Sequence, residues 1–112
     1  MMPTTTYDQV SVVKNATISY DGRCSSHTVL FEDGSKKMLG VILPCDENVR
    51  EYEFATHTSE RMEITGGECE VKITGEDAFT YYRAGQAFVV AGDSSFTLRT
   101  EQIVQYICHL EG

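Results

Sequence analysis

The chain has 112 residues, of which 41% are hydrophobic and 23% are charged, and its formal net charge is −8. This length and balance predict one globular domain, and they argue against an intrinsically disordered chain. The negative charge argues against the basic surface that nucleic-acid binding needs and, more weakly, against anionic membranes, although a local arginine or lysine can still bind an anionic substrate.

The N-terminal segment, MMPTTTYDQ, has neither the basic start nor the apolar stretch of a signal peptide. No apolar run in the chain approaches the roughly 18 residues of a membrane-spanning helix. We therefore expect a cytoplasmic protein with a flexible segment at residues 1–7 and one domain at residues 8–112. Its four widely spaced cysteines are expected to be free thiols: Cys24, Cys45, Cys69 and Cys108.

Short, β-branched and apolar segments dominate from residue 10 onward, separated by glycine-rich turns. The strands are predicted at residues 10–20, 27–31, 37–43, 52–56, 61–65, 68–74, 79–83, 87–91, 95–100 and 103–110. No window of a dozen residues has the 3.6-residue apolar period of a helix. The pattern predicts an all-β barrel or sandwich with a loop around residues 45–51.

Two spacings stand out in this series of strands. Glu60 is followed by six residues and Gly67, and Gly85 is followed by five residues and Ala91. Cupins, the double-stranded β-helix or jelly-roll proteins, carry two motifs of this shape that hold a metal with three histidines and one glutamate. When the motifs are laid on this chain, Glu60 keeps the glutamate position. Three other residues stand at the histidine positions: Phe54, Thr56 and Phe96.

Phenylalanine cannot ligate a metal, and one carboxylate with one hydroxyl makes a poor transition-metal site. We therefore expect a cupin-like barrel without a metal. Asp93 stands at the second motif's other glycine position, and Ala91 replaces its proline. His57 is expected at the surface or the mouth, because it alternates with Thr56 and lies outside the motif's register.

Nearly the whole chain, from about residue 8 to 110, resembles one family of small single-domain cupins, the pyrimidine/purine nucleoside phosphorylases. The resemblance is carried by YDGRCSSHTVLFEDG, LGVILP, F-x-T-x-x-x-E-x-M with GECEVKI, AGQAFVV, SSF and YICHL. The chain departs from the family in a longer link at residues 45–53 and in Ala91. The resemblance implies phosphorolysis of both nucleoside classes to a free base and ribose 1-phosphate, with no metal or organic cofactor.

Residue types in this segment suit such chemistry. Glu60 can bind ribose hydroxyls or stabilise an oxocarbenium-like sugar. Strand alternation predicts Phe54, Thr56 and Met62 on one face, which Glu60 shares if the intervening turn preserves the strand phase. Phe54 and Phe96 can stack on base or sugar, and stacking tolerates every base. Thr56 is expected to act with Glu60 in catalysis, and Ser94 and Ser95 are expected to contact the substrate. The hydroxyls of these three residues, with nearby backbone amides, are also the phosphate candidates, while Tyr106 can line the cavity.

Simpler structural roles remain open for these residues. Phe54, Met62 and Phe96 are also typical barrel core, and we expect His27 and His109 to be structural. None of Arg23, Arg61, Arg83 and Arg99 is singled out as the phosphate ligand, and Arg61 is expected to face away from Glu60. Two other functions also remain open, a non-catalytic binding module and a metal-dependent cupin enzyme, and a homodimer is expected.

Overall fold

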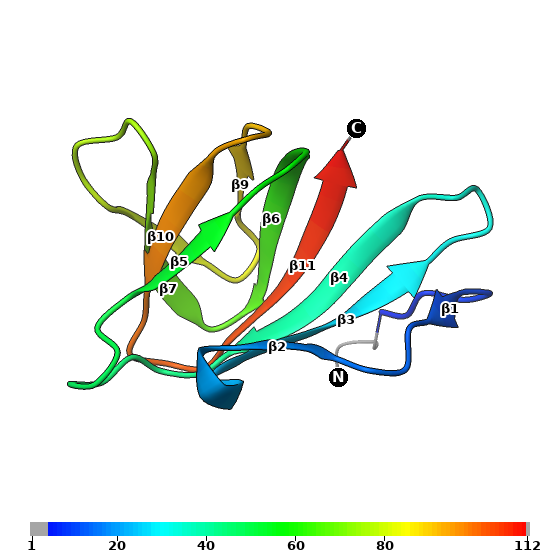
Figure 1. Cartoon of the computed structure of the whole chain (residues 1–112), viewed down its shortest axis with the longest axis horizontal. Helices are drawn as coiled ribbons and strands as arrows, with labels where there is room; N and C mark the ends of the chain where they lie inside the picture. Colours follow the sequence, from blue (N-terminus) through cyan, green and yellow to red (C-terminus); the bar gives the residue numbers. More distant parts are fainter. Residues whose placement is uncertain (1–4, 112) are drawn as a thin grey trace.

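The computed structural model describes residues 5–111, which form two antiparallel β-sheets that face each other (Figure 1). The larger sheet has seven strands: β1 (Ser11–Val12), β2 (Thr17–Ser19), β3 (Cys24–Leu30), β4 (Lys36–Ile42), β6 (Ser59–Gly66), β9 (Ala87–Val90) and β11 (Val104–Glu111). The smaller sheet has four: β5 (Tyr52–Ala55), β7 (Glu68–Ile73), β8 (Thr80–Arg83) and β10 (Ser95–Arg99). A short 3₁₀ turn, η1 (Tyr20–Gly22), follows β2.

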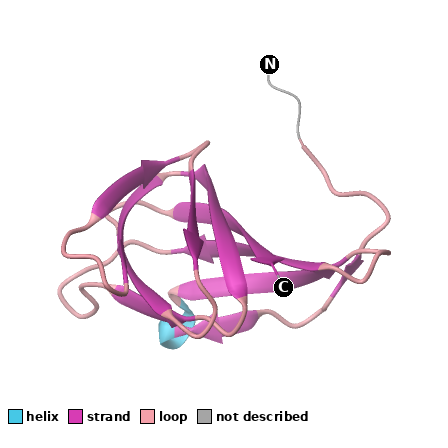
Figure 2. Ribbon diagram, turned by 90° about the horizontal axis from the view of Figure 1, so that it is seen from above, coloured by secondary structure: helices cyan, strands magenta, loops and turns pink. Residues whose placement is uncertain are grey.

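The strands of the larger sheet follow the order β1-β3-β4-β11-β6-β9, with β2 also paired to β3, and those of the smaller sheet follow β5-β10-β7-β8. Seen from above, the sheets curve around a shared interior (Figure 2). The all-β prediction is confirmed. Within residues 5–111 no strand ladder joins the two sheets, so the fold is an open sandwich and not a closed barrel.

The observed strands match the predicted segments closely, with one correction at the N-terminal end. The segment predicted as one strand over residues 10–20 contains two short strands, β1 and β2, and the turn η1. Tyr20, Asp21 and Gly22 all have positive φ angles, of 51°, 55° and 93°. Residues in the left-handed conformation end an extended strand. The alternation of side chains in the preceding residues gives no sign of this turn, so the sequence predicted one continuous strand.

Residues that alternate along the strands form the core between the sheets. In β10, Phe96 and Leu98 are 2% and 0% exposed, whereas their neighbours Thr97 and Arg99 face outward. Tyr52 and Ile64 are fully buried and belong to the same cluster. Burial of each such side chain stabilises the fold by roughly 1.5–3 kcal/mol, which makes this shared interior the main support of the sandwich.

The turns that contain Gly67 and Asp93 have backbone geometries that account for the residues found at these two motif positions. Gly67 follows β6 with φ +78°, and a Cβ there would lie 2.3 Å from the carbonyl oxygen of Ile103. A larger residue would clash with backbone at this point, so the turn from β6 into β7 requires glycine. Asp93, which replaces the second motif's glycine, also has a positive φ of 52°, a conformation that aspartate tolerates better than most residues.

Residues 1–4 of the predicted flexible segment lie outside the described part of the chain. Thr5 to Tyr7 are exposed, and the ring of Tyr7 packs edge-on against Phe31 with centroids 5.2 Å apart. Across residues 5–111, no helix is long and apolar enough to cross a membrane.

Candidate active site

A cavity of about 250 Å³ opens between the two sheets, and both sheets contribute to its lining. Phe54 and Phe96 reach it from the smaller sheet. The larger sheet supplies a more polar wall: Thr17, Ser26, Glu60, Tyr106 and Cys108. The cavity thus has an aromatic side and a side with hydroxyl, thiol and carboxyl groups.

Glu60 lies on the inner face of β6, two residues before the buried Met62, and both side chains line the cavity. The turn before β6 therefore places both side chains on the face that lines the cavity together with Phe54, whereas Thr56, which was predicted to share this face, does not line the cavity. The Sγ of Cys108 donates a hydrogen bond to Oε1 of Glu60 over 3.2 Å. Burial, with the Glu60 carboxylate as the next cause, raises the pKa of the Cys108 thiol, so this sulfur keeps its proton and acts as a donor.

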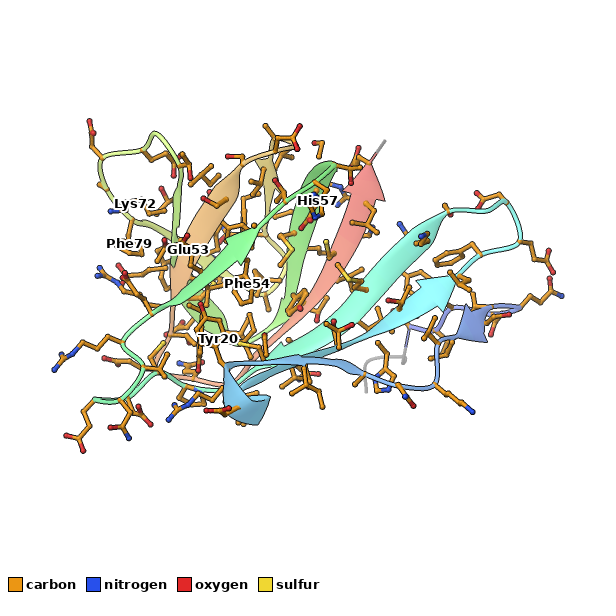
Figure 3. All side chains as sticks on the ribbon, viewed as in Figure 1. Tyr20, Glu53, Phe54, His57, Lys72 and Phe79 are labelled. Atoms are coloured by element: carbon orange, nitrogen blue, oxygen red, sulfur yellow. The ribbon has the colours of Figure 1, made fainter. Side chains whose placement is uncertain are left out.

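The aromatic side is built from rings that pack on one another. Phe54 and Phe96 lie 5.3 Å apart with their planes inclined by 38°, and Phe88 meets Phe96 edge-on at 5.4 Å. Phe96 is 2% exposed and forms part of the core, whereas Phe54 is half-buried. Phe54 extends from β5, near the ring of Tyr20, with centroids 6.3 Å apart (Figure 3). Phe54 is therefore the ring with more surface available to a ligand.

Three predicted site residues do not line this cavity: Thr56, Ser94 and Ser95. Thr56 lies just beyond β5, where its hydroxyl donates to the carbonyl of Ala91 at 2.6 Å and accepts from the amide of Ser94 at 3.0 Å. The Ser95 hydroxyl pairs with that of Thr74 at 2.6 Å. The Thr56 hydroxyl joins two loops, because the chain leaves strand geometry after Ala55 at the end of β5 and again after Val90 at the end of β9.

The histidines lie away from the cavity. His57 is exposed in the loop after β5, at the opposite end of that strand from Tyr20 (Figure 3). His27 is exposed on β3. His109 is buried on β11, where its Nε2 lies 2.8 Å from Oε1 of Glu63 and its Nδ1 lies 2.6 Å from the Lys37 ammonium. His109 is thus part of a polar cluster on the outer face of the larger sheet.

None of the four candidate arginines lines the cavity. Arg23 pairs with Asp46 at 2.9 Å, and Arg61 lies 3.5 Å from Glu111, facing away from Glu60 as expected. Arg99 pairs with Glu70 at 3.1 Å and stacks on the ring of Phe79 at 3.7 Å. Arg83 is exposed on β8.

The longer link at residues 45–53 lies at a second, more open hollow of about 770 Å³ on the outer side of the smaller sheet. Cys45, Asp46 and Arg50 contribute to it. Glu68 there accepts from Tyr81 and from Gln102, the latter at 3.0 Å, and the hollow also contains the Arg99–Glu70 pair. Because most of these charged groups already satisfy one another, the interior cavity is the stronger candidate for a site.

The cavity does not suit the metal that most cupins hold. The aligned ligand positions bring in two phenyl rings and one hydroxyl that is already used in loop contacts. Among residues 5–111, no group of three or more histidine, cysteine, aspartate or glutamate side chains has the arrangement of a metal site. Four hydroxyl residues that line the cavity were missed by sequence reasoning, because only the pairing of β2 with β3 brings them to it: Thr17, Ser19, Ser25 and Ser26.

The fold is a cupin-like β-sandwich, and residues other than histidine stand at the three histidine positions of the aligned cupin motifs. The cupin domain of Cnp3 from Schizosaccharomyces pombe superposes with a TM-score of 0.57 at 14% identity, over 79% of this chain and 61% of that one, which confirms the predicted cupin-like fold. A sequence model of the family described as pyrimidine/purine nucleoside phosphorylase matches residues 14–110. The chain belongs to this family, as its sequence motifs predicted.

Named relatives extend the match over almost the full length. Pyrimidine/purine nucleoside phosphorylase 1 of Psychrobacter arcticus is 73% identical over 106 residues, which cover 95% of this chain and 96% of that protein. The pyrimidine/purine nucleoside phosphorylase of Acinetobacter baumannii is 49% identical over 99% of this chain and 100% of the relative. A crystal structure of a protein of unknown function from Acinetobacter sp. ADP1 superposes with a TM-score of 0.90 at 48% identity, covering 95% and 98% of the two chains.

Proposed function

We propose that this protein is a broad-specificity nucleoside phosphorylase, which converts a purine or pyrimidine nucleoside and inorganic phosphate into free base and ribose 1-phosphate. The observation that carries the proposal is the position of Glu60. It is the single carboxyl group lining the interior cavity within the described residues, and it faces an aromatic wall. Relatives that cover nearly the whole chain bear the name pyrimidine/purine nucleoside phosphorylase.

The reaction breaks the bond between C1′ of the sugar and a nitrogen of the base. The base leaves with the bonding electron pair, positive charge develops on the sugar, and a phosphate oxygen forms the new bond to C1′. A carboxylate that accepts hydrogen bonds from the ribose hydroxyls or lies against the sugar stabilises that charge most where water is excluded. Glu60 is proposed for this role, and the donor thiol of Cys108 holds it in place.

Substrate contacts are proposed for the side chains that share the cavity with Glu60. Phe54 offers a ring face on which either class of base can stack, and Phe96 supports that ring from behind. Met62 and Tyr106 complete the surroundings of the sugar and base. Thr56, Ser94 and Ser95, which the sequence suggested for catalysis and substrate or phosphate contact, are instead proposed to hold the loops at the end of the cavity.

The test is release of free base from uridine, adenosine and inosine, measured by chromatography with and without phosphate. The proposal expects base and ribose 1-phosphate only when phosphate is present. Equal release without phosphate would make the protein a hydrolase. Saturable nucleoside binding, seen as a thermal shift without any product, would make it a binding module. The cytoplasmic location and the homodimer stay predictions from the sequence.

A further inference from the structure

Four residues from four neighbouring strands stand in one row across the inner face of the larger sheet. Thr17 of β2 pairs with Ser26 of β3, Ser26 pairs with Gly40 of β4, and Gly40 pairs with Tyr106 of β11. Thr17, Ser26 and Tyr106 all line the interior cavity. The sheet register thus brings three hydroxyl groups, distant in sequence, to one wall of the cavity.

Gly40 is what allows the ring of Tyr106 to join this row. A Cβ at Gly40 would lie 2.2 Å from Cζ and 2.4 Å from the hydroxyl oxygen of Tyr106, distances at which atoms cannot coexist. The phenol ring therefore lies across the empty place above Gly40, and its hydroxyl extends along the row toward β3. Any larger residue at position 40 would clash with the Tyr106 ring and displace it from this position.

The hydroxyl of Tyr106 is held in its neutral form. Burial is the main cause, and with the nearby Cys108 it raises the pKa of Tyr106 to about 12, although the Ser26 side chain acts in the opposite direction. The phenol therefore carries a proton throughout the physiological range and can donate a hydrogen bond. Each hydroxyl of the row can both donate and accept, and each can rotate to suit its partner.

The charges around the cavity select the kind of ligand for this row. Among the described residues, neither an arginine nor a lysine lines the cavity, whereas the carboxyl group of Glu60 does. A phosphate dianion placed against these hydroxyls would face that carboxylate in a partly buried site, where charge repulsion is poorly screened. A neutral partner with donor and acceptor groups fits better.

We propose that the row Thr17–Ser26–Tyr106, completed by Gly40, binds the polar edge of the nucleoside base while Glu60 engages the sugar; this rests on the proposed function. Keto oxygens need a donor and exocyclic amino groups need an acceptor, and a rotating hydroxyl supplies either. The row therefore accepts purines and pyrimidines alike, and stacking on Phe54 adds contact without discrimination. Gly40 is a positioning residue, because it has no side chain and so leaves the space in which the Tyr106 ring lies.

The test measures the synthetic direction, in which free base and ribose 1-phosphate give nucleoside and phosphate. Tyr106→Phe keeps the ring and removes one hydrogen-bonding group, so the KM for uracil and for adenine should rise by about tenfold. The KM for ribose 1-phosphate, and that for phosphate in the forward direction, should stay within about twofold of wild type. Tyr82→Phe is the matched control, because Tyr82 is half-buried against Phe88 and does not line the cavity.

Gly40→Ala tests independently whether the placement of the Tyr106 ring over residue 40 matters for base binding. It should raise the KM for base in the wild-type background and have little further effect when Tyr106 is already alanine. A rise in the KM for phosphate instead of base would overturn the proposal, as would unchanged constants in Tyr106→Phe. If the wild-type protein forms no product, the proposed function fails. Calorimetry with uracil and adenine then tests separately whether the row binds a base. Weaker base binding in Tyr106→Phe would then support it, and equal or undetectable binding would overturn it.

Discussion

Thr56 shows that a position matching a ligand in the family pattern can serve the loops instead of the cavity. Its side chain is 4% exposed, and its hydroxyl joins the end of β5 to the segment that follows β9. The same segment contains Asp93, which has a left-handed conformation. The amide of Asp93 donates a hydrogen bond to the carbonyl of His57 over 3.2 Å. This loop pair is thus held by backbone geometry and one buried hydroxyl.

Thr56→Val should lower the free energy of unfolding by about 2 kcal/mol, because it leaves the Ala91 carbonyl and the Ser94 amide without their buried partner. Urea denaturation measures the change. Thr65→Val is the control, since Thr65 is exposed on β6 and should change stability by less than about 0.5 kcal/mol. Equal effects of the two substitutions would contradict this structural role.

The buried thiols predict how stability depends on pH. Burial raises the pKa of Cys24 and of Cys69 from 9.0 to about 11. In the unfolded chain these thiols ionise near their ordinary pKa, so their contribution to stability is complete below pH 9 and is lost as the pH rises to about 11. The melting temperature should therefore fall over this range, and it should fall less in Cys69→Ala. A Cys69→Ala curve parallel to that of wild type would exclude this explanation.

At the scale of elements, η1 fastens the edge of the smaller sheet to the larger one. The hydroxyl of Tyr20 donates to the carbonyl of Glu53 at 3.1 Å and accepts from its amide at 2.8 Å. The Tyr20 ring also packs edge-on against Tyr52, with centroids 5.0 Å apart. Because β5 is an edge strand, these contacts satisfy backbone groups that would otherwise have only solvent as a partner.

Tyr20→Phe should keep the ring packing and release the Glu53 amide, which should then exchange faster with solvent deuterium. The free energy of unfolding should fall by only about 1 kcal/mol, since the freed groups can bond to water. Hydrogen exchange followed by NMR measures the local effect. Tyr81→Phe, which removes a contact with Glu68 on the outer side of the smaller sheet, should leave the Glu53 amide unchanged. Unaltered protection of Glu53 in Tyr20→Phe would exclude this role.

Local patterns predicted those parts of the site that lie on one continuous strand. The spacing from Glu60 to Gly67 covers β6 and its closing turn, so alternation placed Glu60 and Met62 on the inner face. Thr17 and Ser26 could not be found in this way. Their position depends on the pairing of β2 with β3 and of β3 with β4, which is set by long-range packing, and residues 10–20 contain a break that their β-branched composition hides.

For the whole molecule, the outer face of the larger sheet bears on the predicted homodimer. It exposes apolar side chains at Leu39, Val41 and Val89, which are 38%, 37% and 59% exposed. Leu39 and Val41 lie side by side on the outer face of β4, while Val89 lies on β9, beyond β11 and β6. Neighbouring exposed apolar side chains on a sheet face are typical of a contact between subunits. We expect the protein to sediment at twice its chain mass of 12.5 kDa.

Leu39→Glu should convert the predicted dimer to a monomer, because it places a charge among the apolar side chains of the expected contact. Ile103→Glu, at an exposed position in the loop before β11, should leave the mass unchanged. Sedimentation at several concentrations distinguishes the two. A monomeric wild-type protein, or a Leu39→Glu variant that remains dimeric, would contradict the predicted contact.

The interior cavity gives the whole molecule its proposed activity, and Glu60 is the group on which that activity depends. Glu63 provides a matched comparison, since it lies on the same strand but on the outer face, bonded to His109. The most direct measurement is the rate of phosphate-dependent base release by Glu60→Gln and by Glu63→Gln, both confirmed as folded by circular dichroism. We predict that Glu60→Gln loses most of the activity while Glu63→Gln retains it. Wild-type rates in Glu60→Gln would contradict the assignment of this cavity as the active site.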